Sequence, residues 1–437
     1  MKILLRNNYS AWILTCASLV PFCFLWLPSH SADMSGIYQW WVALDQLGVG
    51  IYKNDSINYP GLGVLSVSGI GWLVNQIHPD AINTEFILIY RVILVWFHTL
   101  NVLIMYYLLN RLGVAAASWW VLCIALLPSS WLGGAVWGQV DTVTQFFLLI
   151  AYVSVLWCHS LIQRSPGRSF FLAFFIAILL GGASALILLH KQLGYFSLPA
   201  IGLGLIGLLA HASCRRKYWL ALGCIASIGV STVMVTLPDH FLVLPHDYRS
   251  HILLVLFSGR SGHGNVISSN GFNLWTLFFS GSSSPILTCG LSVKSIGLIL
   301  FCSIGFSLWA SAAYFIWNYV RSCERFSIRI VAGIVFLVHG AHNLLFNIVL
   351  TGTHERYLFH CYPFLLMAYS LFGRRIVGKW EILIALAGAL VYGEFVRSVL
   401  LGRTQNVALC LSIQVLVLLG TGCVLARVVS REKARAI

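Results

Sequence analysis

Residues 169–189 read SFFLAFFIAILLGGASALILL and contain no charged side chain. A run of this length can cross the hydrocarbon core of a bilayer as one helix, which takes about 20 apolar residues. The rest of the chain repeats the pattern. Of its 437 residues 59% are hydrophobic and 9% are charged, and the mean hydropathy is +0.86. This composition excludes an ordinary soluble domain and predicts an all-α integral-membrane protein.

The apolar runs together predict a polytopic bundle of about 12 transmembrane helices. Their approximate bounds are 11–28, 86–110, 114–132, 142–162, 169–189, 194–213, 218–237, 294–319, 330–350, 358–373, 380–396 and 405–428. The run at 60–77 is shorter and rich in glycine, so we interpret it as a re-entrant or interfacial segment. The whole chain, 1–437, is then one integral-membrane unit with long outer loops at about 29–85 and 238–293.

Charged residues sort to opposite sides of this predicted bundle. With the N-terminus in the cytoplasm, only Glu324, Glu381 and Glu432 of the 13 acidic residues lie on the cytoplasmic side. That side holds 18 of the 27 basic residues, namely Lys2, Arg6, Arg111, Arg164, Arg168, Arg215, Arg216, Lys217, Arg321, Arg325, Arg329, Arg374, Arg375, Lys379, Arg427, Arg431, Lys433 and Arg435. Cytoplasmic loops carry an excess of Lys and Arg. We therefore predict a multi-pass plasma (inner) membrane protein with both termini cytoplasmic.

The net charge of +14 is thus a topology signal. The cations lie in separated short loops and form no single basic stripe, so they do not favour a nucleic-acid partner. The 12 cysteines show no Cys-x-x-Cys spacing, and most are expected to be small buried side chains. No H-E-x-x-H, P-loop or G-x-S-x-G pattern is present, which gives no support to zincins, P-loop NTPases or serine hydrolases.

The predicted outer side gathers carboxylates and amides. Asp33 follows the first apolar run, where a carboxylate suits a general base, a metal ligand or a helix cap. Gln139 and Asp141 belong to Trp137-Gly138-Gln139-Val140-Asp141, which separates two apolar runs. An ionisable residue at this depth either faces the bundle for function or caps the next helix.

The same side carries candidate cations. Lys191, in His190-Lys191-Gln192, either binds phosphate or extends its amine toward the membrane surface. Arg260 precedes Asn270-Gly271-Phe272-Asn273-Leu274-Trp275 and is either an anion ligand or a solvated side chain. His354-Glu355-Arg356-Tyr357 is the densest cluster. Because forked guanidinium donors bind phosphate well, we favour a binding role for it over a helix-end salt bridge.

Four polar residues lie inside predicted spans and keep a rival function open. Arg91, His98, His339 and His342 are either core side chains bonded to the backbone or parts of a transport path. A transporter or flippase of a lipid-linked sugar is therefore the alternative. Transporters tend to show inverted repeats and charges near the midplane. Here no repeat is visible and the charges cluster at one edge.

The motifs, taken in order, resemble the GT-C superfamily of membrane glycosyltransferases that use polyprenyl-phosphate sugars. The bacterial mannosyltransferase-like branch is the most similar, and the dolichyl-phosphate-glucose glucosyltransferases are also similar. Asp33 resembles the first-loop acid of these enzymes, although Met34 and Ser35 follow it where many carry a second acid. The other matching stretches are Tyr59-Pro60-Gly61-Leu62, Trp137 to Asp141, His190 to Gln192, Asn270 to Trp275 and His354 to Tyr357.

The resemblance implies a GT-C-like fold and a hexosyltransferase. It would move mannose or glucose from a polyprenyl-phosphate donor to an acceptor hydroxyl on a glycan, lipid or protein of the cell envelope, with inversion, at an extracytoplasmic site. It implies Asp33 as the catalytic base and Arg260, His354, Arg356 and Lys191 as ligands of the donor phosphate. The substrate-orienting residues would be Gln139, Asp141, Glu355, Asn270, Asn273 and Trp275. The sequence requires no cofactor and identifies no metal ligands, although a divalent metal is compatible with this chemistry.

Overall fold

The computed structural model describes residues 2–47, 61–78, 83–164, 169–238, 266–269, 271–279, 285–287, 290–322, 326–354, 357–403 and 405–436. These residues are almost entirely helical. The first half of the chain forms α1 (Lys2–Leu19), η1 (Val20–Phe24), α2 (Ser31–Leu47), α3 (Gly61–Ile77), α4 (Asn83–Arg111), α5 (Ala117–Leu126), α6 (Pro128–Trp131), η3 (Leu132–Trp137), α7 (Asp141–Arg164), α8 (Phe170–His190) and η4 (Gln192–Ser197).

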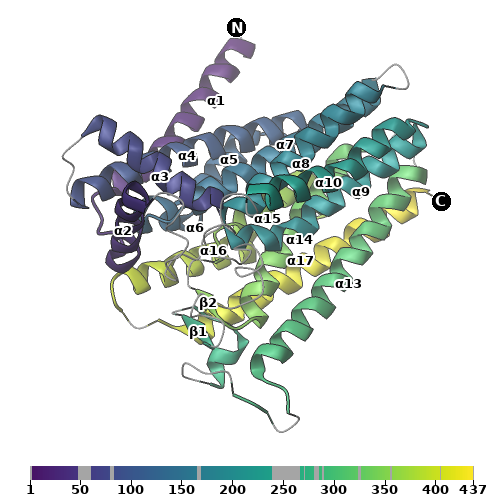
Figure 1. Ribbon diagram of the computed structural model, residues 1–437. Coiled ribbons are helices and arrows are strands. Elements are labelled where there is room, and N and C mark those ends of the chain that lie inside the picture. Colours follow the sequence, from purple (N-terminus) through teal and green to yellow (C-terminus); the bar gives the residue numbers. More distant parts are fainter. Residues whose placement is uncertain are drawn as a thin grey trace.

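The second half continues the bundle and adds two short strands. Its elements are α9 (Leu198–Cys214), α10 (Tyr218–Pro238), β1 (Ser268–Ser269), η6 (Leu274–Leu277), α13 (Val293–Ser322), α14 (Ile328–Val349), β2 (Thr353–His354), α15 (Cys361–Phe372), α16 (Lys379–Leu400) and α17 (Val407–Ala436). β1 and β2 pair in parallel, with Ser268 opposite Thr353. Figure 1 shows the long helices lying side by side around α14 and α15.

The predicted class, an all-α membrane protein, is confirmed. Within the described ranges nine helices are long and apolar enough to cross a membrane: α4, α7, α8, α9 with η4, α10, α13, α14, α16 and α17. Two shorter apolar helices, Ser10–Phe24 and Cys361–Phe372, fall within two further predicted spans. One more predicted span, at 114–132, is a broken helix.

The break in this span turns the chain toward the candidate site. Ala117–Leu126 and Pro128–Trp137 meet at an angle of 78°. Pro128 lacks a backbone N–H and pushes the residue before it out of the helical region, and Leu127 accordingly has an extended backbone (φ −66°, ψ 129°). A π-helical stretch, η3, follows and ends at Trp137. The sequence run looked like one straight crossing, whereas the proline divides it.

The centre of the bundle is the pair α14 and α15, whose side chains are buried almost throughout. Gly340 permits their close approach. A Cβ atom at this position would lie 2.4 Å from Cγ of Leu365 on α15. Small residues at helix contacts let backbones approach closely inside a membrane, where packing rather than the hydrophobic effect drives helix association. This pair forms the rigid support to which the loop carrying His354 is attached.

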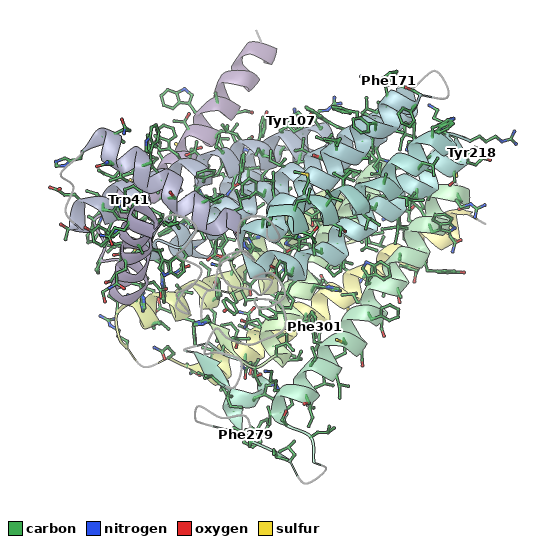
Figure 2. All side chains as sticks on the ribbon, viewed as in Figure 1. Trp41, Tyr107, Phe171, Tyr218, Phe279 and Phe301 are labelled. Carbon is green, nitrogen blue, oxygen red and sulfur yellow. The ribbon has the colours of Figure 1, made fainter. Side chains whose placement is uncertain are left out.

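The helix ends that flank the predicted cytoplasmic loops contact one another at one end of the bundle, here called the basic end. Arg329 Nη1 donates a hydrogen bond to the carbonyl of Gly113 at 3.0 Å, and Lys217 Nζ donates to the carbonyl of Ile162. Arg431 Nη1 reaches the carbonyl of Arg375 at 3.3 Å. Figure 2 shows Phe171 and Tyr218 near this end, with Trp41 and Phe279 far from them. Each of these three contacts joins segments that the charge distribution assigns to the same side.

The segment expected to be re-entrant or interfacial forms α3, which packs against the opposite end of the bundle. Ser66 Oγ lies 3.2 Å from Nε2 of His190, and His78, just after α3, lies 3.8 Å from Glu85 at the start of α4. The start and the end of α3 thus lie near helix ends of the same side, as a segment that does not cross would require. α2, in the first of the predicted outer loops, begins at Ser31 and so includes Asp33 in its first turn.

Cysteine labelling tests the two ends. In a cysteine-free background, Gln76→Cys on α3 should react with a membrane-impermeant maleimide in intact cells. Arg216→Cys and Arg374→Cys at the basic end should react only after permeabilisation. All three native side chains are exposed. Labelling of Gln76→Cys and Arg216→Cys from the same side of the membrane would contradict the arrangement.

Candidate functional site

Asp33 is held by two residues of the Trp137–Asp141 motif. Its Oδ2 accepts a hydrogen bond from Trp137 Nε1 at 2.7 Å and another from Gln139 Nε2 at 2.7 Å. The ring of His30 stacks on Trp137, with ring centroids 4.5 Å apart, and the backbone N–H of Asp33 donates to His30 Nδ1 at 3.3 Å. The Asp33 side chain is 27% exposed. The carboxylate is therefore oriented by two donors and still reaches solvent.

Gly138 lets α2 lie against this motif. Its φ of +91° lies in the left-handed region that glycine adopts at low cost. A Cβ atom there would lie 2.3 Å from Sδ and 2.6 Å from Cε of Met34, which is almost fully buried. A side chain at 138 would therefore require both a strained backbone and displacement of the end of the Met34 side chain, on the helix that carries Asp33.

A buried ion pair lies behind the carboxylate. Lys191 Nζ is 2.6 Å from Asp141 Oδ1, and the two side chains are 4% and 0% exposed. Lys191 also donates to Gln139 Oε1 at 3.4 Å. Gln139 thus joins both groups, since its amide nitrogen donates to Asp33 and its oxygen accepts from Lys191. Asp33, Gln139, Lys191 and Asp141 thus form a continuous polar chain. Burial of two charges costs free energy unless good geometry and further hydrogen bonds compensate, so the positions of these side chains are tightly constrained.

His190 links three helices next to this chain. Its Nδ1 lies 2.8 Å from Thr144 Oγ1 on α7, and its Nε2 lies 3.2 Å from Ser66 Oγ on α3. Phe147 packs edge-on against its ring. The imidazole is fully buried. We therefore infer a structural role for His190, which connects α8 to α3 and α7 next to the polar chain.

His360 belongs to the same neighbourhood and was missed by the sequence analysis. It is fully buried at the start of α15 and interacts electrostatically with Asp141 and Lys191. Neither ring nitrogen has a hydrogen-bond partner among the described residues. Such an unsatisfied buried group costs free energy and calls for an explanation. Its sequence signal is an imidazole that opens an apolar run six residues after His354.

A second cluster surrounds β1 and β2. Asn273 caps η6 by accepting hydrogen bonds from the backbone of Trp275 and Thr276, and its Nδ2 donates to Thr353 Oγ1 at 2.9 Å. Trp275 Nε1 donates to the carbonyl of Val349 at the end of α14. Both residues, expected to orient substrate, thus have roles in fixing this corner. Their contact with a substrate stays a prediction.

His354 lies on β2 of this corner, and its ring contacts Tyr357 edge-on, with centroids 5.1 Å apart. The chain from His354 to His360 is short, which limits the distance between their Cα atoms to about 20 Å. The polar chain of Asp33 and the corner of His354 therefore belong to the same end of the bundle. Arg260, Asn270, Glu355 and Arg356, the remaining predicted site residues, lie outside the described residues.

The polar residues inside the spans have local partners. His339 Nδ1 lies 2.6 Å from Tyr152 Oη, and His342 Nε2 lies 3.0 Å from the carbonyl of Gly305. Arg91 Nε donates to the carbonyl of Ala135 at 2.9 Å. These contacts fit the interpretation as core side chains. In the described part of the chain no three His, Cys, Asp or Glu side chains are grouped so that they could hold a metal ion.

Comparison with known proteins adds no assignment. The chain matches no protein-family model and has no significant match among curated protein sequences. The resemblance to GT-C enzymes therefore rests on the sequence motifs alone.

Replacement of Gly138 by Ala should destabilise the protein. The left-handed backbone and the overlap with Met34 together should lower the free energy of unfolding by about 1–3 kcal/mol, measured by thermal unfolding of the purified protein in detergent. Gly36→Ala on α2 is the matched control, because a Cβ there meets no atom within 4 Å. Equal stability of the two variants would contradict the packing argument.

Proposed function

We propose that this protein is a GT-C-type hexosyltransferase that moves mannose or glucose from a polyprenyl-phosphate donor to an acceptor hydroxyl, with inversion. The fold proposed with it is a GT-C-like bundle of 12 crossings. The bent pair and the two shorter apolar helices would complete the nine long helices. The site would face the extracytoplasmic side of the plasma (inner) membrane, as the charge distribution indicates.

One observation carries this proposal: the carboxylate of Asp33 is partly exposed and is oriented by Trp137 and Gln139, each at 2.7 Å. A general base must be held within reach of the proton that it accepts. The two donors leave the carboxylate at the end of the bundle, where a hydroxyl from solvent or from the membrane surface can approach. The first-loop acid and the W-G-Q-x-D motif thus form one unit, although more than 100 residues separate them.

The proposed reaction is a single displacement. The acceptor hydroxyl gives its proton to Asp33 as its oxygen attacks the anomeric carbon. The bond from this carbon to the phosphate oxygen breaks, and polyprenyl phosphate leaves with the bonding electrons. Cationic donors stabilise the charge that develops on the phosphate. Arg260, His354 and Arg356 are the residues that we propose for this role.

Lys191 fits a different role from the one expected. Because its ammonium group is buried against Asp141, we propose that it positions Gln139 and, through Gln139, Asp33. Asp141 then compensates the lysine charge. His360 lies beside this pair with unsatisfied nitrogens. We propose that a polar group of the substrate or an ordered water satisfies it during the reaction.

Asp33→Asn should remove activity. The amide keeps the size of the side chain but cannot accept a proton, so transfer should fall by at least ~10²-fold. The measurement is mass spectrometry of lipid-linked and surface glycans from cells that lack the gene, complemented with each variant. Glu85→Gln is the control, because Glu85 is an exposed carboxylate at the same end of the bundle. A normal glycan profile with Asp33→Asn would remove the proposed base.

His360→Leu should separate stability from activity. Leucine has a similar volume and no polar atom, so the free energy of unfolding should stay equal or rise, because two unsatisfied nitrogens are removed. Transfer in membranes supplied with polyprenyl-phosphate mannose or glucose should fall by at least ~10-fold. A variant that loses stability and keeps its activity would show that His360 serves packing alone.

A further inference from the structure

A polar cavity lies at the basic end of the bundle, at the opposite end of the helices from Asp33. It has a volume of about 610 Å³ and lies between the ends of α4, α7, α9 and α14. The transfer reaction proposed above uses none of its residues. Its lining contains three arginines from three separate segments: Arg111 at the end of α4, Arg215 after α9 and Arg329 in the first turn of α14.

Among the described residues that line this cavity, no acidic side chain balances the positive charge. None of the described residues that line it is Asp or Glu. Arg329 is fixed by the carbonyls of Gly113, Ser370 and Leu371. Arg111 and Arg215 are exposed, and neither forms an ion pair with a described carboxylate. Three guanidinium groups around one opening, without an acid among them, favour an anion.

The inner wall of the cavity contains a pair of buried histidines. His159 Nδ1 and His211 Nδ1 are 3.2 Å apart, and their rings are stacked. At this distance one ring donates its N–H to the other. His159 Nε2 is buried without a hydrogen-bond partner among the described residues. This ring nitrogen in the cavity wall is therefore available for a hydrogen bond to a ligand.

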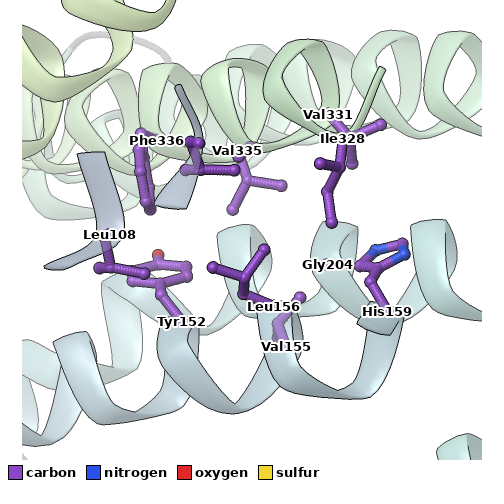
Figure 3. Close-up of a pocket in the computed structure, with 12 residues that line it drawn as sticks. Leu108, Tyr152, Val155, Leu156, His159, Gly204, Ile328, Val331, Val335 and Phe336 are labelled. Atoms are coloured by element: carbon purple, nitrogen blue, oxygen red, sulfur yellow. The ribbon is translucent and has the colours of Figure 1, made fainter. Parts of the chain in front are cut away.

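The cavity continues inward as an apolar space. Leu112, Leu156, His159 and Ile328 line both the polar cavity and a deeper cavity of about 30 Å³. Figure 3 shows the deeper cavity, with His159 at one end and Phe336 toward the other. Its walls are almost entirely apolar. The deeper space has room for only about two water-sized groups, so the acyl chains of a lipid ligand would lie outside it, along the helices.

We propose that this cavity binds the phosphate headgroup of an anionic membrane lipid. Forked guanidinium donors match phosphate oxygens, and basic pockets between membrane helices on one face bind acidic headgroups. The cavity lies at the ends of membrane-spanning helices, where lipid headgroups are found, and this position favours a lipid over free phosphate. A bound headgroup would join four helices at the end of the bundle opposite Asp33.

The test is lipid binding to the purified full-length protein in nanodiscs or detergent. Phosphatidylglycerol should raise the thermal unfolding midpoint of the wild type, whereas phosphatidylcholine should not. In Arg111→Gln/Arg215→Gln the apparent Kd for phosphatidylglycerol should rise roughly 10- to 30-fold. Arg374→Gln/Arg375→Gln removes the same charge from exposed positions at the same end, outside the cavity, and should bind like the wild type.

A second variant covers the case in which the double arginine variant does not fold. Gln163→Glu introduces a carboxylate of the same size into the exposed part of the lining and should weaken phosphatidylglycerol binding by a similar factor. Equal weakening by Arg374→Gln/Arg375→Gln would reduce the effect to general surface charge and overturn the site. Equal protection by inorganic phosphate would overturn the lipid as its ligand, and so would lack of protection by phosphatidylglycerol.

Discussion

The orientation of Asp33 depends on a chain of polar contacts that begins inside the bundle. Asp141 and Lys191 form a buried ion pair, and Gln139 bonds both to this lysine and to the partly exposed carboxylate of Asp33. Each member limits the next, because a buried amide has few ways to satisfy both of its ends. The arrangement of α2, α7 and α8 at this end therefore has to satisfy one polar network as well as ordinary packing.

The sequence was sufficient for the general architecture because its two signals are strong and local. Many apolar runs of about 20 residues are typical of membrane-spanning helices. The arginines of the short loops divide the helix ends into a basic group and a group poor in basic residues. Packing at the basic end, such as the contact of Arg329 with Gly113, joins segments that this division assigns to one side. The glycine-rich segment, which the sequence predicts to be re-entrant or interfacial, forms α3 at the other end of the bundle.

The parts that could not be predicted depend on contacts between distant segments. Nothing in the local sequence around Trp137 states that its indole meets a carboxylate 104 residues earlier. The motif suggested a functional turn, but the partner of each side chain follows from the bend at Pro128 and the approach of α2. His360 was missed for a related reason, since one imidazole at the edge of an apolar run carries no meaning until Asp141 and Lys191 lie beside it.

Two separate constraints favour glycine at position 138: the space taken by Met34 and the left-handed backbone. A smaller residue at 34 would make room for a Cβ atom, yet the left-handed backbone at 138 would still favour glycine. A change at position 34 alone would therefore not release position 138 from its need for glycine. The shape of the turn that receives Asp33 depends on its own backbone more than on the side chain packed against it.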